Sequence, residues 1–540
     1  MKKIILVPLI ALVLSFGIFG FQKDFFEIAK QIEIFTTLYK DLNMNYVDET
    51  VPAELMENAI KGMLEELDPY TNFYNEQDVE AARINATASY AGIGATVKGQ
   101  QDKLIVMEVW KDGPADQAGL KAGDEITKID NVAIASVQED AGALINGAPG
   151  TSFEVSYNRQ GKTQSATLKR ESNEEKAVPF YELIDNNTGY IVLSAFNRKT
   201  TRETKYALQD LKSQGAQRII LDLRGNPGGI LGEAVNVVNL FVPKGEVITT
   251  TKSVVEKYNQ EYKTQFEPVD TEIPLVVLIN GRSASASEIV SGAIQDLDRG
   301  VIVGARSFGK GLVQRPKPLA YGTQVKITIS KYYTPSGRCI QAEDYFNRDE
   351  NGDPIRATPD NFNAFKTRGG RTVYDGGGIL PDVEMASAAY SPITTAILKD
   401  NAIFEYASEY YYSHNVTDLE TFQFTDKDFQ DFVSYLKKSN FHYETETEAA
   451  LNEVLKKAEE ENLQADIAKN YQALLSDIEK GKDKAIQEKK AEIVSLLTDE
   501  IIKRYFYREG LYDYHIQHNP EIKEALEVLN NEKRYRTILN

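Results

Sequence analysis

The sequence has few of the residues that many catalytic and structural sites need. One of its 540 residues is a cysteine, Cys339, so no intramolecular disulfide can form. It has four histidines, all in the last quarter of the chain: His414, His442, His515 and His518. A Ser-His-Asp triad or a histidine-bound zinc would have to take its imidazole from that quarter. Chemistry carried by the earlier residues alone must therefore run without histidine.

The sequence also lacks an excess of positive charge. It contains 61 lysines and arginines against 80 aspartates and glutamates, which gives a net charge of −19. Nucleic-acid binders carry a basic face for phosphates, so we exclude a nucleic-acid partner. Hydrophobic residues are 42% of the chain and charged residues 26%, as in globular proteins. At ~150 residues per domain, the length predicts roughly three to four domains.

The N-terminus reads as an export or anchor signal. Lys2 and Lys3 precede an apolar run over residues 4–21, which as a helix would span ~27 Å, just enough to cross a bilayer. The run ends without an Ala-x-Ala cleavage pattern, so we expect an uncleaved inner-membrane anchor, with a cleaved signal or a buried core helix as alternatives. An uncleaved anchor and a cleaved signal would both place the remaining chain in the cell envelope, on the periplasmic side.

Hydrophobic periodicity divides the rest of the chain into regions that differ in predicted secondary structure. Short strands with two short helices predict a small β-rich module, and alternating strands and helices predict an α/β domain with parallel strands. The fold class is therefore multidomain α/β with helical regions at both ends. The expected divisions are 1–22 (signal or anchor), 23–87 (N-terminal helical region), 88–172 (β-rich module), 173–390 (α/β core) and 391–540 (C-terminal helical region).

Two segments superficially suggest a bound ion or cofactor. Within the polar stretch 342–375, Asp349–Asp353 lacks the spacing and the position-12 glutamate of a calcium loop, so we expect a solvated turn. Gly304–Gly311 nearly matches a phosphate-binding loop. It has Gly311 where magnesium binding needs serine or threonine, and the prolines that follow cannot open a helix. We therefore expect no metal and no nucleotide.

A serine-rich turn is the first candidate site. The apolar strand predicted over Leu275–Ile279 runs into Asn280–Glu288, which opens a helix. Backbone N–H groups at a helix N-terminus favour negative charge, and so could stabilise the oxygen of an attacked carbonyl. From position alone, Ser283, Ser285 and Ser287 are equally well explained as turn and capping residues.

Lys310 is the second candidate, because a lysine flanked by glycines after an apolar strand can be partly desolvated. Burial favours the neutral amine, which is a competent general base, and serine–lysine pairs are known substitutes for serine–histidine pairs. Gln314 could accept a hydrogen bond from Lys310 and orient it. The glycine-rich turn Asp222–Gly229 could supply an oxyanion donor, although by itself it is explained as a structural turn.

Together these motifs resemble the carboxyl-terminal processing proteases, also called tail-specific proteases, over roughly residues 25–390. The 25-residue separation from Ser285 to Lys310 matches the family's spacing. The segments that carry the resemblance are 222–229, 283–288, 307–314, 331–337 and 377–382.

The resemblance implies a crotonase- or Clp-like peptidase core with an insertion at 342–375, and it implies a role for each site residue. Ser285 would be the nucleophile, Lys310 the general base and Gln314 its orienter. The implied oxyanion-hole amides are those of Ala286 and of Gly228 or Gly229.

The resemblance also implies that 88–172 is a PDZ domain, which would capture a protein's C-terminal tail by strand addition. Its carboxylate-binding loop would include Gly92, Ile93, Gly94 and Ala95. The chain departs from the family at Ile145-Asn-Gly147, where relatives often carry Leu-Arg-Gly, and that arginine is linked in relatives to regulation.

The sequence thus predicts a serine endopeptidase that cleaves tail-docked protein substrates through an acyl-enzyme and needs no cofactor. A catalytically silent PDZ scaffold and a crotonase-like hydrolase of acyl thioesters are the alternatives. Intact Ser285, Lys310 and Gln314 argue against the scaffold, and the PDZ region argues against the thioesterase. An adaptor or regulator protein and a homo-oligomer formed through the terminal helical regions are further expected partners.

Overall fold

The computed structural model describes residues 25–79, 91–137, 141–171, 176–350, 352–385, 390–439, 441 and 443–540. The apolar run 4–21, expected to be an anchor, lies outside these residues. Within the described ranges, no helix is both long and apolar enough to span a bilayer. The chain divides into two compact units: Met1–Glu76 with Gln314–Thr328, and Gln77–Val313 with Ile329–Asn540.

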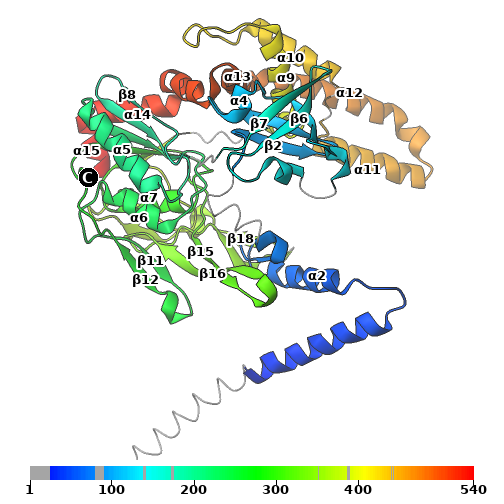
Figure 1. Ribbon diagram of the computed structural model, residues 1–540, viewed down its shortest axis with the longest axis horizontal. Helices are drawn as coiled ribbons and strands as arrows, with labels where there is room; N and C mark the ends of the chain where they lie inside the picture. The colour runs from blue at the N-terminus through cyan, green and yellow to red at the C-terminus, as the bar shows by residue number, and fades with distance from the viewer. Residues whose placement is uncertain are drawn as a thin grey trace, which may run out of the picture. The chain divides into compact units, whose positions relative to one another are not determined.

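The first unit contains a helix over residues 25–45, followed by α2 (Pro52–Glu65) and the short strand β1 (Asn72–Tyr74). Most of a β-hairpin, made by β15 (Leu312–Pro318) and β16 (Gln324–Tyr333), belongs to the same unit. β1 pairs antiparallel with the start of β16. Figure 1 labels both strands of the hairpin. The predicted N-terminal helices are thus followed by a strand that the periodicity did not indicate.

In the second unit, the predicted PDZ region forms a sheet in the order β2–β3–β4–β6–β7 around a buried apolar cluster. Of the short strands that were expected here, β3 spans Lys103–Val109, and one of the two expected short helices is α4 (Pro114–Gln117). The other strands are Ala95–Gln100 (β2), Glu125–Ile129 (β4), Val132–Ala133 (β5, paired with β4), Ser152–Arg159 (β6) and Lys162–Lys169 (β7).

The core of the second unit is a six-stranded sheet in the order β21–β14–β13–β10–β9–β8. Its strands are parallel except for β8, which forms an antiparallel hairpin with β9. Strands β9 and β13 are buried at every position, as expected where helices cover both faces of a parallel sheet. The bounds are Phe180–Ile184 (β8), Thr188–Val192 (β9), Arg218–Asp222 (β10), Leu275–Ile279 (β13), Val301–Gly304 (β14) and Val383–Glu384 (β21).

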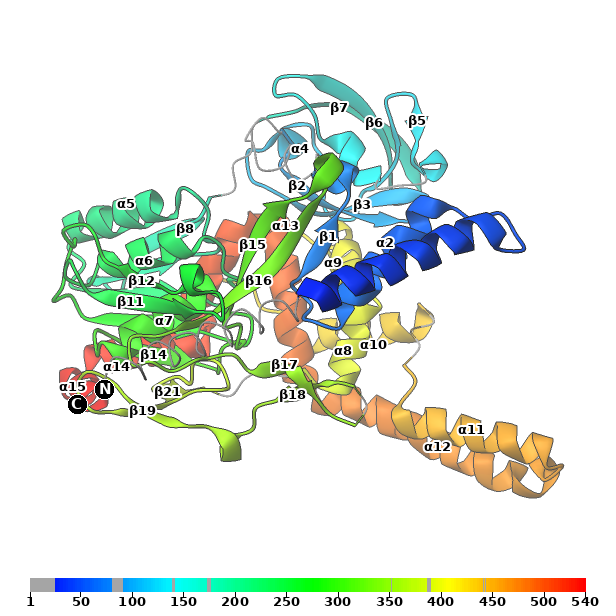
Figure 2. The same cartoon turned by 90° about the horizontal axis from the view of Figure 1, so that it is seen from below.

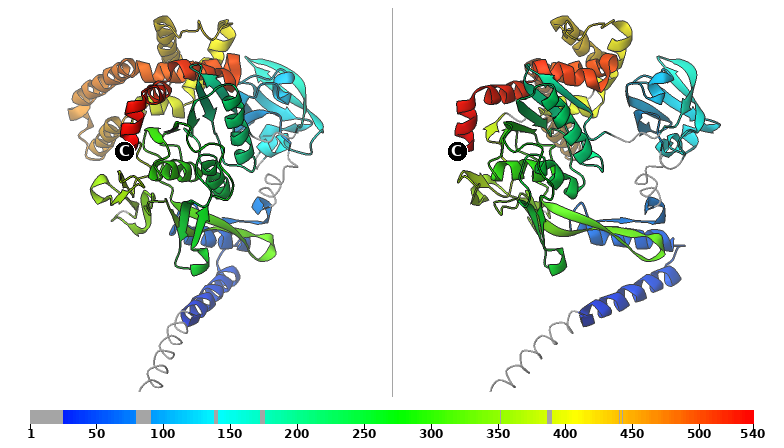
Figure 3. Two further views of the ribbon diagram at one scale, coloured as in Figure 1. Left: turned by 90° about the vertical axis from the view of Figure 1, so that its left-hand side faces the viewer. Right: turned by 60° about the vertical axis from the view of Figure 1, so that its left-hand side comes forward.

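Alternate residues of these strands pack against two different helical layers. Residues such as Ile219 and Val277 pack with α5 (Thr200–Ser213), α6 (Leu231–Asn239) and α7 (Ala286–Asp296). Their neighbours Ile220 and Val276 pack instead with Ile522, Ala525 and Val528 of α14 (Pro520–Asn530). Figures 2 and 3 show the red C-terminal helices beside the green core. The C-terminal region therefore completes the core of the predicted peptidase domain.

The remaining C-terminal helices are α8 (Pro392–Lys399), α9 (Ala402–Ser413), α10 (Asp426–Lys438), α11 (Glu446–Glu460), α12 (Gln464–Glu488), α13 (Lys490–His518) and α15 (Glu532–Leu539). Helices α8, α9, α10, α12 and α13 pack around a second apolar cluster, α11 packs against α12, and α15 packs near α14.

The polar stretch 342–375 forms two small hairpins. They are β17 (Glu343–Arg348) with β18 (Pro354–Arg356), and β19 (Ala364–Lys366) with β20 (Thr372–Tyr374). Asp349 N–H donates to the Asp353 carbonyl at 2.8 Å, so this acidic segment is a hairpin turn. Among the described residues, no group of histidine, cysteine or carboxylate side chains is placed to hold a metal ion. Strands β11 (Val247–Lys252) and β12 (Gln260–Lys263) were not expected, and the end of β16 pairs with β11.

Candidate active site

The serine turn joins β13 to the N-terminus of α7, and Ser285 stands at the N-cap position. Its backbone has φ 55° and ψ −110°, a strained conformation for a residue with a side chain, costing about 1–3 kcal/mol. Nucleophilic serines at sharp strand-to-helix turns are held in a similarly strained way, which exposes their hydroxyl. The backbone thus singles out Ser285 among the three serines.

The other two serines have structural roles. Ser283 Oγ donates to the Leu223 carbonyl at 2.8 Å, and Ser287 Oγ donates to the Asn226 carbonyl at 2.9 Å. Both serines are fully buried, whereas Ser285 is only partly buried. The capping and turn interpretation therefore holds for Ser283 and Ser287, and Ser285 is left as the candidate nucleophile.

The glycine-rich loop 222–229 lies directly against the serine turn. Ala284 N–H donates to the Asn226 carbonyl at 3.0 Å. Gly228 N–H donates to Asn226 Oδ1 at 2.9 Å, so this amide is already used within its own loop. The N–H groups of Gly229 and Ala286 have no acceptor among the described residues. Of the amides predicted for the oxyanion hole, these two remain able to donate to a substrate oxygen.

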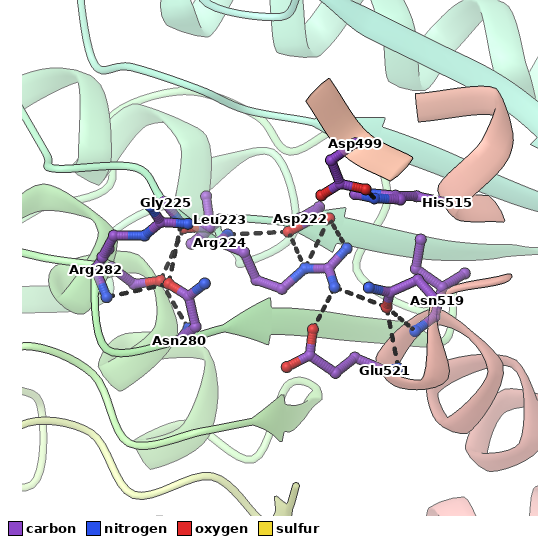
Figure 4. Close-up of polar contacts among 12 residues, drawn as sticks. Asp222, Leu223, Arg224, Gly225, Asn280, Arg282, Asp499, His515, Asn519 and Glu521 are labelled. Atoms are coloured by element: carbon purple, nitrogen blue, oxygen red, sulfur yellow. Dashed lines mark hydrogen bonds and ion pairs between the residues drawn. The ribbon is translucent and has the colours of Figure 1, made fainter. Parts of the chain in front are cut away.

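The start of the same loop is anchored to the C-terminal region (Figure 4). Arg224 Nε lies 2.9 Å from Asp222 Oδ1, and Arg224 Nη1 donates to Asn519 Oδ1 at 2.8 Å and also pairs with Glu521. Tyr190 OH donates to Asp222 Oδ2 at 2.6 Å. Burial alone would raise the pKa of Asp222, but the Arg224 charge and the hydrogen bonds from Arg224 and Tyr190 together lower it. Helix α14 thus helps to fix the loop that carries Gly229.

Glu288, which was not identified from the sequence as a site residue, connects the serine turn to the lysine loop. Its Oε2 accepts the N–H of Ser285 at 2.7 Å and the N–H of Lys310 at 2.9 Å. Its Oε1 accepts the Ser307 hydroxyl and the Gly309 N–H, both at 2.6 Å. The available signal was the Ser-x-x-Glu spacing of a capping box, but that pattern predicts only the contact with Ser285.

The electrostatic setting of Glu288 follows from its complete burial. Burial raises the pKa of Glu288 to about 7, while the hydrogen bonds from Ser307, Gly309, Lys310 and Ser285 act in the opposite direction. The hydrogen bonds from the two loops therefore offset part of the free-energy cost of burying the charged carboxylate.

Gln314 and the predicted tail-binding loop occupy other parts of the chain. Gln314 belongs to the first unit, where its Nε2 donates to Thr328 Oγ1 at 3.3 Å, and its action on Lys310 stays a prediction. Gly92 N–H donates to the Glu171 carbonyl at 3.1 Å. The N–H groups of Ile93 and Gly94 have no acceptor among the described residues, and Ala95 begins β2.

Comparison with known proteins gives three family matches along the chain. Residues 91–169 match a PDZ domain, residues 187–349 match Peptidase family S41, and residues 393–529 match the C-terminal helical domain of probable PDZ-proteases. The Carboxy-terminal-processing protease of Bartonella bacilliformis is 35% identical over 319 residues, covering 58% of this chain and 73% of the relative. The chain belongs to peptidase family S41.

Other relatives of this S41 peptidase match over similar lengths. The Carboxy-terminal processing protease CtpA of Bacillus subtilis is 33% identical over 307 residues, covering 56% of this chain and 65% of the relative, slightly under two thirds. Among solved structures, a photosystem II D1 C-terminal processing protease is 26% identical, covers 65% of this chain and 92% of that chain, and has a TM-score of 0.38. The match of residues 393–529 assigns the C-terminal helical region to a family, which the sequence motifs did not do.

We predict that Gly228→Ala damages the S41 site without disturbing the sheet. Gly228 has φ +102°, and an added Cβ would lie 2.7 Å from the Ala284 carbonyl oxygen and 2.8 Å from Ser285 Cβ. The serine turn would have to move, so we expect proteolysis of labelled casein to fall on the order of 100-fold. Gly232→Ala is the matched control, because nothing lies within 4 Å of its added Cβ. If Gly228→Ala and Gly232→Ala digested casein at the same rate, the predicted clash between position 228 and the serine turn would be wrong.

We also predict that Glu288 makes stability depend on pH. A carboxyl whose folded pKa, about 7, exceeds its unfolded value near 4.5 loses favourable free energy as pH rises between those values. The loss is roughly 3 kcal/mol. The Tm of the wild type minus that of Glu288→Gln, which cannot titrate, should therefore decrease from pH 4.5 to pH 7.5 in thermal unfolding. A constant difference would show that Glu288 titrates normally.

Proposed function

We propose that this S41 member is a serine endopeptidase that uses Ser285 as nucleophile and Lys310 as general base. The observation that supports this most strongly is the shared carboxylate oxygen, Glu288 Oε2. It lies within 2.9 Å of the amide nitrogens of both Ser285 and Lys310, which are 25 positions apart in the chain. A base must come within hydrogen-bonding reach of the proton that it removes, and this bridge holds the two backbones close together.

The proposed reaction is acyl transfer in two halves. Ser285 Oγ attacks a peptide carbonyl while its proton passes to the neutral Lys310 amine, and the oxyanion accepts hydrogen bonds from Ala286 and Gly229. Collapse of this intermediate breaks the C–N bond, and the leaving amine takes the proton from Lys310. Water then attacks the acyl-serine and gives a proton to Lys310. Lys310 passes that proton to Ser285 Oγ as the ester C–O bond breaks, which releases the new carboxyl terminus and restores the serine hydroxyl and the neutral amine.

Substrate selection is proposed to begin at the PDZ domain. A protein tail would add as a strand, and its terminal carboxylate would accept hydrogen bonds from the Ile93 and Gly94 amides. A site in the cell envelope, reached through the apolar run 4–21, fits such a role. An adaptor protein and a homo-oligomer are further proposed partners. The helix over 25–45, which exposes large apolar side chains such as Phe25 and Ile32, is one candidate surface for them.

The proposal predicts that Ser285→Ala and Lys310→Ala each lower the digestion of fluorescein-labelled casein by about 1,000-fold or more, because neither group can substitute for the other. The exposed helical variants Ser434→Ala and Lys456→Ala are the controls and should match the wild type. If both site variants digest casein at the wild-type rate, the dyad is wrong. If the wild type digests nothing while its PDZ domain still binds tail peptides, the silent-scaffold reading replaces the proposal.

A second prediction concerns the substrate's end. The same unstructured peptide is compared with a free C-terminal carboxylate and with a carboxamide, which lacks the charge. Hydrogen bonds to a charged group contribute about 1.5–3 kcal/mol, so the amidated peptide should show a kcat/KM lower by about 10-fold or more. Equal rates for both peptides would contradict capture of the terminal carboxylate.

A further inference from the structure

A second side chain touches the backbone of both proposed dyad residues. Tyr332, on β16, has its hydroxyl 2.7 Å from the Lys310 carbonyl oxygen and 3.1 Å from the Ser285 carbonyl oxygen. Its single proton is shared between these two acceptors. Tyr332 is 1% exposed, and burial raises its pKa well above the usual value for tyrosine. The hydroxyl therefore keeps the proton that it donates.

Glu288 and Tyr332 thus hold opposite sides of the same two residues. Glu288 accepts from the N–H groups of Ser285 and Lys310, and Tyr332 donates to their carbonyl groups. All four peptide groups that flank the proposed nucleophile and base are therefore tied in pairs by two buried side chains. We propose that Glu288 and Tyr332 form a backbone clamp that sets the position of Ser285 relative to Lys310.

The site needs such a clamp because both Ser285 and Lys310 could otherwise move. A serine at φ 55° and ψ −110° persists only where its surroundings hold it in that conformation. Lys310 lies on a glycine-flanked loop, whose backbone is intrinsically free to adopt many conformations. Without the clamp, the serine can relax and the lysine backbone can drift, and a misplacement of about 1 Å can cost about 100-fold in rate.

The lysine loop is held further by neighbours of the clamp. Tyr332 N–H donates to the Gly311 carbonyl at 2.9 Å, and Gly311 N–H donates to Gln341 Oε1 at 2.7 Å. Both Glu288 and Tyr332 act through the backbone of the dyad and are therefore positioning residues. The inference rests on the proposed function, since a clamp matters to catalysis only if Ser285 and Lys310 react.

The test compares two tyrosine-to-phenylalanine variants in the full chain. Tyr332→Phe removes only the hydroxyl of the clamp. The control, Tyr535→Phe, removes a hydroxyl that accepts from Leu275 N–H at 3.0 Å, at the opposite end of β13 from the serine turn. With labelled casein, we expect Tyr332→Phe to lower kcat by about 10- to 100-fold with KM within about twofold of wild type. Tyr535→Phe should keep the wild-type kcat at a comparable change in Tm.

A second variant pair guards against a general folding defect. Glu288→Gln keeps the shape of the side chain but replaces one acceptor oxygen with an NH₂ donor, so it should lower kcat more than Tyr332→Phe. Glu448→Gln is its control, because Glu448 is a buried capping glutamate three residues after Thr445 in the C-terminal helices. Wild-type kcat in both Tyr332→Phe and Glu288→Gln would overturn the clamp.

The failure of the clamp and the failure of the dyad give different results. Ser285→Ala and Lys310→Ala are assayed beside the clamp variants. If these two are inactive while Tyr332→Phe and Glu288→Gln retain full kcat, the proposed function stands and the clamp is wrong. If Ser285→Ala or Lys310→Ala digests casein like the wild type, both the proposed function and the clamp are wrong. A loss in Tyr332→Phe that appears in KM alone, with kcat unchanged, also contradicts a positioning role.

Discussion

The buried carboxylate of Glu288 is the interaction on which the candidate site depends. It accepts hydrogen bonds from two segments that approach it from different strands, the serine turn after β13 and the loop after β14. A buried carboxylate is unfavourable unless its oxygens are satisfied, and here the satisfying groups are the backbones that chemistry must bring together. The free energy that would be lost on leaving Glu288 unsatisfied therefore opposes separation of the two loops.

The sheet beside that carboxylate is covered on both faces. Helices α5, α6 and α7 supply one layer, and α14 from the far C-terminus supplies part of the other. The same helix reaches the glycine-rich loop, since Asn519 and Glu521 contact Arg224. The C-terminal helical region thus helps to build the candidate site, and removing it would expose the apolar face of the sheet and release one side of the glycine-rich loop.

Much of this arrangement could be predicted from local sequence. The run Leu275–Ile279 forms a strand with the predicted bounds, because five consecutive apolar residues suit a strand buried on both faces. Ser285 and Lys310 both stand where loops leave the ends of parallel strands, which the alternation of strands and helices indicates. Within the polar stretch 342–375, the turn expected around Asp349 and Asp353 is present. The two hairpins of this stretch were not expected, since their short strands are too polar to show a clear alternation.

The parts that escaped prediction depend on contacts between distant residues. Tyr332 and Ser285 are 47 positions apart, and Glu288 and Lys310 are 22 apart, so neither contact leaves a periodic signal. The apolar face of α14 is visible in its sequence, but the partner of that face is decided by the tertiary fold. Gly228 N–H was expected to be an oxyanion donor as plausibly as Gly229 N–H, and only the position of the Asn226 side chain separates them.

The central claim is that Ser285 becomes nucleophilic because Lys310 is held beside it. The most direct measurement is covalent labelling by a fluorophosphonate, which reacts with activated serines, followed by mass spectrometry of the labelled peptide. We expect a single phosphonylated residue, Ser285, in the wild type, and a labelling rate lowered by about 100-fold or more in Lys310→Ala, because this variant lacks the base. Labelling of Ser283 or Ser287, or an unchanged rate in Lys310→Ala, would contradict the central claim.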